Sequence, residues 1–283
     1  MERYQLGLYE KAMPTGLTFE QMLDAARTSG FDFLEMSVDE TDARLARLDW
    51  DAQQRTALVD AMERQGIAVR SICLSGHRKY PLGSHDDAVR ARGEEIFEKA
   101  VRLADSLGVR IIQLAGYDVY YEAGDEQTRE RFLQSLARGV DCAARYGVLL
   151  GFETMETPFM DTVEKAMAYV RRIGSPYLGV YPDIGNLTNA ALLYGTDVLA
   201  DVACGRGHLV AMHLKETVPG KYRDMDFGQG DVDFRAAARC ARENGVRRFV
   251  AEFWDDGRED WRGRLCGVSA FLRRALDGAF AER

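Results

Sequence analysis

The chain has 283 residues, of which 46% are hydrophobic and 29% are charged, so it can bury a large core within one large α/β domain or two smaller ones. Its formal net charge of −8 argues against a surface that holds the phosphate backbone of a nucleic acid. No stretch reaches the roughly 18 apolar residues of a membrane helix and the first residues lack signal-peptide features, so we expect a cytoplasmic protein without a nucleic-acid or membrane partner.

Short apolar runs alternate with longer amphipathic segments along the whole chain, and no linker or low-complexity block interrupts them. The runs predict eight strands, at residues 4–10, 33–38, 69–76, 109–116, 148–154, 177–183, 209–216 and 248–254. Helical patterns follow them, such as TFEQMLDAARTSG (18–30), DAQQRTALVDAMERQG (51–66), EEIFEKAVRLADSLG (94–108) and FRAAARCARENG (234–245). Several of these segments end in Gly just before the next strand, as a helix C-terminus often does.

Eight strand–helix units at a spacing of roughly 35 residues match the size of a (β/α)8 barrel. The alternative with the same alternation is an open, doubly wound sheet. However, no GxGxxG follows the first strand and no P-loop sequence is present. We therefore predict an α/β fold, a (β/α)8 TIM barrel that forms a single domain over residues 1–283.

The predicted barrel also predicts where chemistry should take place, because the active site of this fold lies at the C-terminal ends of the strands. Four consecutive strands place a carboxylate or an imidazole at or near this end: Glu153, Asp183, His213 and Glu252. The alternation of side chains within the seventh and eighth strands is consistent with a shared inward direction. We therefore expect these four side chains to converge.

Three carboxylates and one imidazole in a semi-enclosed site repel one another unless a cation is present. A rim carboxylate taken singly is as well explained by an ion pair with Arg or Lys, but equivalent positions on four adjacent strands are hard to explain as independent pairs. We therefore expect one divalent metal ion. Oxygen-rich ligation with a single imidazole favours Mn²⁺, with Mg²⁺, Co²⁺ and Zn²⁺ as alternatives.

Several longer stretches resemble one family from end to end. They are GLYEKAMP, GFDFLEMSVDETDARLARLDW, CLSGHRKYPLGSHDDAVR, IIQLAGYDVYY, YPDIGNL and FGQGDVDF. With them the chain resembles the sugar-phosphate epimerases of the xylose-isomerase-like barrel superfamily. Within that superfamily the resemblance is greatest to the L-ribulose-5-phosphate 3-epimerases, also called L-xylulose-5-phosphate 3-epimerases.

This resemblance implies a metal site and a reaction. The related ketose 3-epimerases hold their metal with Glu, Asp, His and Glu from the last four strands, and these positions correspond to Glu153, Asp183, His213 and Glu252. The implied reaction is metal-dependent inversion of C3 in a ketopentose 5-phosphate through an enediolate, with Glu153 and Glu252 exchanging the proton on opposite faces. The family also implies a homo-oligomer, for which we expect a dimer.

One position departs from the free-sugar branch of the related enzymes. Free-sugar 3-epimerases usually carry a His three residues after the metal-binding Asp, where this chain has Asn186. The departure favours a phosphorylated substrate. The alternatives are a 3-epimerase of free ketoses (ribulose, fructose/psicose or tagatose) and a related aldose–ketose isomerase.

Three further residues are candidates for substrate contact: His77, Glu156 and Lys215. His77 closes the third strand, where a hydrogen bond to a loop carbonyl is the alternative role. Glu156 follows Glu153 by three residues, and a loop ion pair is as good an explanation for it. Lys215 has the inward direction of His213 and would contact a substrate oxygen.

Two other classes of protein share the barrel. Apurinic-site endonucleases need a multi-metal cluster with more histidines at the strand ends, and this chain has four histidines in all. A non-catalytic sugar-binding barrel is the second alternative. The retention of both candidate acid–base carboxylates argues against it.

Overall fold

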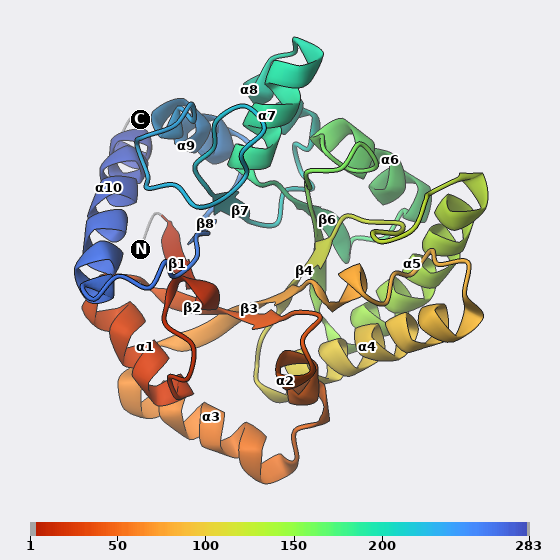
Figure 1. Cartoon of the computed structure of the whole chain (residues 1–283), viewed down its shortest axis with the longest axis horizontal. Helices are drawn as coiled ribbons and strands as arrows, with labels where there is room; N and C mark the ends of the chain where they lie inside the picture. The colour runs from red at the N-terminus through yellow and green to blue at the C-terminus, as the bar shows by residue number, and fades with distance from the viewer. Residues whose placement is uncertain (1–3, 282–283) are drawn as a thin grey trace.

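A computed structural model describes residues 4–281, and its eight parallel strands form a nearly closed barrel inside a ring of helices (Figure 1). The strands are β1 (Gln5–Tyr9), β2 (Phe33–Val38), β3 (Ala68–Leu74), β4 (Ile111–Ala115), β5 (Leu149–Glu153), β6 (Leu178–Tyr181), β7 (Met212–Leu214) and β8 (Arg248–Ala251). They pair in the order β6-β5-β4-β3-β2-β1-β8-β7. The TIM barrel predicted from the sequence is confirmed.

The connections between the strands carry ten α-helices and three 3₁₀ turns within the described residues. The helices are α1 (Phe19–Thr28), α2 (Asp42–Leu45), α3 (Ala52–Gln65), α4 (Asp87–Ser106), α5 (Glu126–Tyr146), α6 (Val163–Ile173), α7 (Ile184–Tyr194), α8 (Val198–Cys204), α9 (Phe234–Glu243) and α10 (Trp261–Ala281). The 3₁₀ turns are η1 (Glu10–Ala12), η2 (Ala46–Asp49) and η3 (Gly76–Arg78). Between residues 4 and 281 no helix combines the length and hydropathy needed to span a bilayer.

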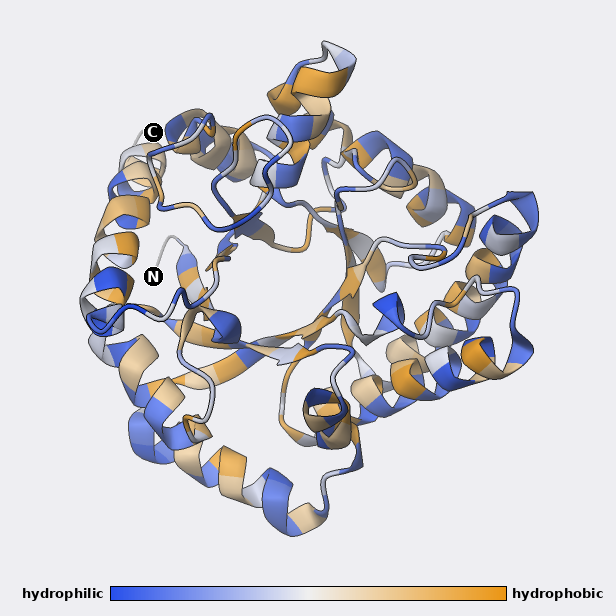
Figure 2. Ribbon diagram, in the orientation of Figure 1, coloured by the Kyte–Doolittle hydropathy of each residue, from blue (hydrophilic) through white to orange (hydrophobic). Residues whose placement is uncertain are grey.

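Each strand buries side chains on both of its faces, as parallel sheets covered by helices do. In β2, Leu34, Met36 and Val38 belong to the large core between the barrel and the helices. Phe33 points the other way, into a smaller cluster that fills the barrel interior with Tyr9, Cys73, Ile111, Tyr181, Ala211 and Val250. Figure 2 shows this pattern as largely hydrophobic strands inside helices of mixed character.

The barrel closes less regularly between β6 and β7 than elsewhere. The two strands meet through isolated bridges, Val180 to Leu209 and Asp183 to His213. Pro182 lies between these bridges and has no N–H to donate, so a continuous hydrogen-bond ladder cannot form there. For this reason β7 covers only Met212–Leu214, although the sequence predicted a strand over 209–216.

Local capping explains where the helices begin and end. Asp51 accepts a hydrogen bond from the Gln54 amide at the start of α3, and Gly66 ends that helix in the left-handed conformation, as the sequence predicted. Helix α4 begins at Asp87, earlier than the predicted start at residue 94. The reason is that the Asp86 carboxylate accepts hydrogen bonds from the amides of Ala88 and Val89.

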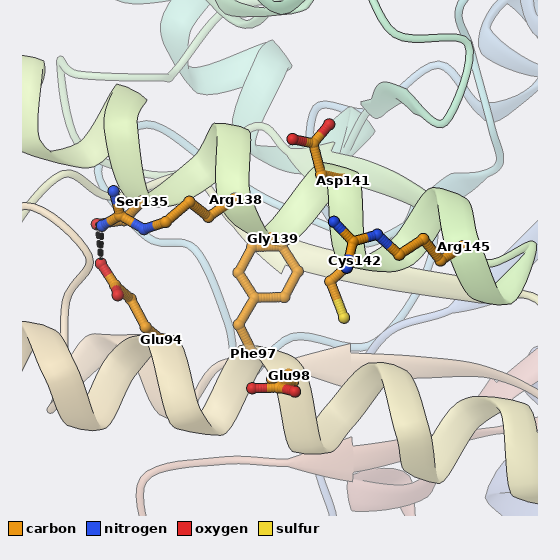
Figure 3. Close-up of a pocket in the computed structure, with 9 residues that line it drawn as sticks. All are labelled: Glu94, Phe97, Glu98, Ser135, Arg138, Gly139, Asp141, Cys142 and Arg145. Atoms are coloured by element: carbon orange, nitrogen blue, oxygen red, sulfur yellow. Dashed lines mark hydrogen bonds and ion pairs between the residues drawn. The ribbon is translucent and has the colours of Figure 1, made fainter.

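Helices α4 and α5 pack closely on the outside of the barrel. Figure 3 shows the ring of Phe97 from α4 pointing at Gly139 of α5, with Arg138 pairing with Glu94 beside them. A Cβ atom added to Gly139 would overlap the Phe97 ring. Gly139 is therefore the residue that lets these two helices approach.

We predict that Gly139→Ala lowers the free energy of unfolding by about 1–3 kcal/mol, because overpacking outweighs the better helix propensity of Ala. Gly267→Ala in α10 is the matched control, since Gly267 is exposed and no atom lies within 4 Å of its added Cβ. That control should gain up to about 1 kcal/mol. Urea unfolding of both variants measures the difference, and a Gly139→Ala protein as stable as the control would contradict the packing account.

Candidate active site

Four side chains converge at the C-terminal end of the barrel. Glu153, Asp183, His213 and Glu252 each offer a ligand atom, these atoms all lie within 4.8 Å of one another, and all four residues are buried. His213 Nδ1 lies 3.2 Å from Glu153 Oε1 and 3.1 Å from Glu252 Oε2. The convergence expected from the sequence is therefore present in the structure.

The positions of these residues follow from the ends of four neighbouring elements. Glu153 is the last residue of β5, His213 is the middle residue of β7, and Glu252 follows the last residue of β8. Asp183 follows β6 by two residues and is also the N-cap of α7, where its Oδ1 accepts a hydrogen bond from the Asn186 amide at 2.8 Å. Asp183 Oδ1 thus caps α7, whereas Asp183 Oδ2 faces the other three side chains.

The donor set of this group suits a divalent cation. Asp183 Oδ2 and Glu252 Oε2 are buried and accept no hydrogen bond, although Lys215 Nζ lies 2.8 Å from the first and 3.5 Å from the second. If all three carboxylates are ionised and His213 is neutral, the single ammonium of Lys215 leaves two negative charges. One divalent ion would balance this charge and satisfy both buried oxygens.

The crowding also shifts the ionisation of the group. Burial raises the pKa of Glu153, and the charge of Glu252 raises it further. Burial likewise holds the pKa of Asp183 well above its usual value, against the attraction of Lys215. Burial would raise the pKa of Glu252 too, but Lys215 and His213 hold it well below its usual value. The pKa values of the two glutamates are thus shifted in opposite directions.

A pocket of about 310 Å³ opens above this group. The residues that line it include Glu153, Glu252, Lys215, Glu156 and Asn186. This volume lies at the lower end of the range for small-molecule sites. Two of the three predicted substrate contacts, Glu156 and Lys215, therefore face the pocket.

Glu156 is held by two tyrosines of the loop after β4. Tyr117 donates a hydrogen bond to Glu156 Oε2 at 2.7 Å, and Tyr120 donates one to Oε1 at 3.4 Å. Glu156 therefore contacts two hydroxyl groups instead of the loop ion pair that was its alternative role in the sequence analysis. Its carboxylate is thus fixed in orientation at the pocket wall.

The structure does not bring His77 to this pocket. His77 is buried, its Nε2 hydrogen-bonds to the Gly93 carbonyl at 3.1 Å, and its ring packs on Phe97 of α4. The chain leaves β3 through the 3₁₀ turn η3, which directs His77 into the helix layer and its neighbour Arg78 toward the pocket. The expectation that His77 contacts the substrate is therefore not retained.

Glu35 is a buried carboxylate at this site that was not found from the sequence. It lies inside the barrel on β2 and is fully buried, and its Oε1 lies 2.7 Å from His213 Nε2. Gln113 of β4 similarly donates a hydrogen bond to Glu153. The available signal was an acidic residue within the apolar run FLEMSV, at the inward position of Phe33.

Among residues 4–281, this group around His213 is the one set of three or more side chains that could hold a metal ion. An endonuclease of the same superfamily would need a multi-metal cluster. The described part of the chain offers a single site instead.

Comparison with known proteins matches this fold. The family model described as a xylose isomerase-like TIM barrel matches residues 23–273. L-ribulose-5-phosphate 3-epimerase UlaE of Salmonella paratyphi C (strain RKS4594) is 47% identical over 275 residues, which are 97% of this chain and 95% of that protein.

Solved structures share the fold at low sequence identity. An L-ribulose 3-epimerase superposes with a TM-score of 0.80 at 19% identity, covering 99% of this chain and 96% of its own. D-psicose 3-epimerase from Clostridium cellulolyticum H10, solved with D-tagatose, superposes with a TM-score of 0.81 at 14% identity. This match covers 96% of the present chain and 99% of the epimerase chain. At these identities the likeness shows a common fold alone.

The position of His77 predicts a pH dependence of stability. Burial lowers the pKa of His77 to about 4, whereas an unfolded histidine titrates near about 6.5. Between these values the unfolded chain binds a proton that the folded chain does not, so the stability present above about pH 6.5 is lost as the pH falls. The stability of the wild-type protein relative to His77→Gln should decrease by about 2 kcal/mol from pH 7 to pH 5. Denaturant unfolding of both proteins measures this, and a difference independent of pH would contradict it.

Proposed function

The chain belongs to the xylose isomerase-like TIM barrel family and is an enzyme of the isomerase class, and we propose that it inverts C3 of a ketopentose 5-phosphate. The proposed substrate pair is L-ribulose 5-phosphate and L-xylulose 5-phosphate, as the name of its 47% identical relatives suggests. The observation that carries the proposal is the convergence of Glu153, Asp183, His213 and Glu252, of which the two glutamates line a pocket.

The four converging residues are the proposed ligands of one divalent metal ion, with Mn²⁺ as the first choice and Mg²⁺, Co²⁺ or Zn²⁺ as alternatives. The ion would supply positive charge that stabilises an enediolate. The unsatisfied oxygens of Asp183 and Glu252 support this assignment. His213 would take part as a neutral imidazole.

Epimerisation at C3 needs a proton to leave one face of the carbon and another to arrive on the opposite face. One glutamate takes the C3 proton, the electron pair of the C–H bond moves toward the C2 carbonyl, and the second glutamate gives a proton to C3 from the other side. Glu153 on β5 and Glu252 after β8 are the proposed pair.

Two further residues have proposed roles in binding. Lys215 lies beside Asp183 and Glu252 and would neutralise charge that develops on substrate oxygens. Glu156, held by Tyr117 and Tyr120, would accept hydrogen bonds from substrate hydroxyls. Asn186 lies in the same pocket, and its presence in place of His supports a phosphorylated substrate.

We further propose that residues 1–283 form one barrel domain and that the protein is a cytoplasmic homodimer. None of its five cysteines is in a disulfide, which supports a reducing compartment. Leu192, Leu193 and Tyr194 are exposed large hydrophobic residues at the end of α7, and exposed apolar groups of this kind are often covered by a partner subunit.

Metal removal tests the proposed site. Dialysis against EDTA should abolish activity with L-ribulose 5-phosphate and lower the melting temperature, and about one equivalent of Mn²⁺ per chain should restore both. Asp183→Asn should bind metal more weakly yet keep α7, because an amide oxygen can still accept the cap hydrogen bond. Full activity in rigorously metal-free protein would overturn the metal proposal.

Substrate choice is tested by removing the phosphate. Because remote binding energy positions the reacting carbon, kcat/KM for free L-ribulose should be lower than for its 5-phosphate by about two orders of magnitude or more. Steady-state kinetics on both substrates with the metal-loaded enzyme measures the ratio. Equal efficiency on both would favour a free-ketose 3-epimerase, and conversion of aldoses alone would favour an aldose–ketose isomerase.

A further inference from the structure

Glu35 is a carboxylate that the proposed reaction does not use. It is completely buried at the third position of β2, inside the barrel. Isolated carboxylates are costly to bury, so hydrogen bonds or opposite charge must compensate Glu35. The groups that surround it therefore indicate its role.

Three side chains from three different strands contact the Glu35 carboxylate. Ser71 of β3 donates a hydrogen bond to Oε2 at 2.6 Å, and Tyr181 of β6 donates one to the same oxygen at 2.9 Å. Oε1 is left for His213 of β7, whose Nε2 lies 2.7 Å away. Among these partners the imidazole is the one that can carry positive charge.

This arrangement fixes the orientation of His213. Carboxylate oxygens accept hydrogen bonds, so we assign the proton of the neutral ring to the nitrogen that lies 2.7 Å from Glu35 Oε1. That nitrogen is Nε2, which leaves Nδ1 as the nitrogen with a free lone pair in the neutral ring. Nδ1 is also the atom that faces Glu153, Glu252 and Asp183, at 3.2, 3.1 and 3.9 Å.

We propose that Glu35 is a positioning residue that holds His213 as its Nε2–H tautomer, with Nδ1 directed at the metal. This inference rests on the metal site of the proposed function. A carboxylate that accepts a hydrogen bond from a metal-binding histidine orients the ring and raises its basicity, and its loss commonly weakens metal binding about 10–100-fold. Ser71 and Tyr181 hold the Glu35 carboxylate in place, and this carboxylate orients the ring of His213.

Metal affinity tests this role independently of catalysis. Glu35→Gln keeps the size of the side chain and an acceptor oxygen but removes the charge. Its Kd for Mn²⁺, measured by electron paramagnetic resonance of the free ion, should rise about 10–100-fold relative to wild type. Co²⁺-loaded Glu35→Gln should also show an altered visible absorption spectrum, since the ligand field at His213 changes.

A matched control separates this effect from general destabilisation. Glu10 is also a buried glutamate, but its carboxylate is held by Arg44 and Arg47 and does not contact His213. Glu10→Gln should lose stability and still bind Mn²⁺ within about threefold of wild type. An equal weakening in both variants would overturn the proposal, because the effect would then come from the fold.

Nuclear magnetic resonance of the wild-type protein provides a test that needs no folded Glu35 variant. Histidine labelled with ¹⁵N in Zn²⁺-loaded protein should show His213 protonated at Nε2 and coordinated through Nδ1, with the signal assigned by its loss in His213→Asn. Protonation at Nδ1 would overturn the proposal. Wild-type protein that binds no divalent ion would instead refute the proposed function, whereas normal Mn²⁺ affinity in Glu35→Gln would refute the role of Glu35 alone.

Discussion

The crowding of three carboxylates and one imidazole at the buried end of the barrel is the constraint on which the site depends. Glu153, Asp183 and Glu252 meet at His213 with a single lysine among them, so three acidic groups share one buried site with one ammonium. Burying these acidic groups together is costly, and a bound divalent ion would offset that cost. The same group could hold a divalent ion, and it contains the two glutamates that we propose exchange the C3 proton.

Residues at this end of the barrel combine a role in the fold with a role in the site. Asp183 caps α7 with one oxygen and faces the group with the other, so its carboxylate cannot rotate without uncapping the helix. Pro182 interrupts the ladder between β6 and β7 at the same place, which lets the chain turn from strand to helix. Inside the barrel, Glu35 ties strands β2, β3, β6 and β7 together beneath the site.

The sequence predicted much of this, and its failures have physical causes. Strand–helix alternation predicted the barrel, and the ends of four consecutive predicted strands predicted the convergence of Glu153, Asp183, His213 and Glu252. His77 was misplaced because period-2 alternation stops where β3 turns into η3, after which sequence spacing no longer gives direction. Glu35 was missed because its partner His213 is 178 residues away, and local patterns do not reveal which distant side chain a buried carboxylate meets. Helix α4 starts earlier than predicted because the Asp86 side chain caps it, and this cap was not recognised from the sequence.

The central claim is that Glu153 and Glu252 each serve one face of C3, and hydrogen exchange in deuterated water tests it most directly. Glu153→Gln and Glu252→Gln are loaded with metal to confirmed full occupancy and incubated separately with each epimer of the ketopentose phosphate. We expect epimerisation to fall by roughly two orders of magnitude or more in both variants. Each variant should still exchange the C3 hydrogen of one epimer, and the two should prefer opposite epimers. Epimerisation at near wild-type rates in both metal-loaded variants would contradict the two-carboxylate mechanism and leave Glu153 as a metal ligand only.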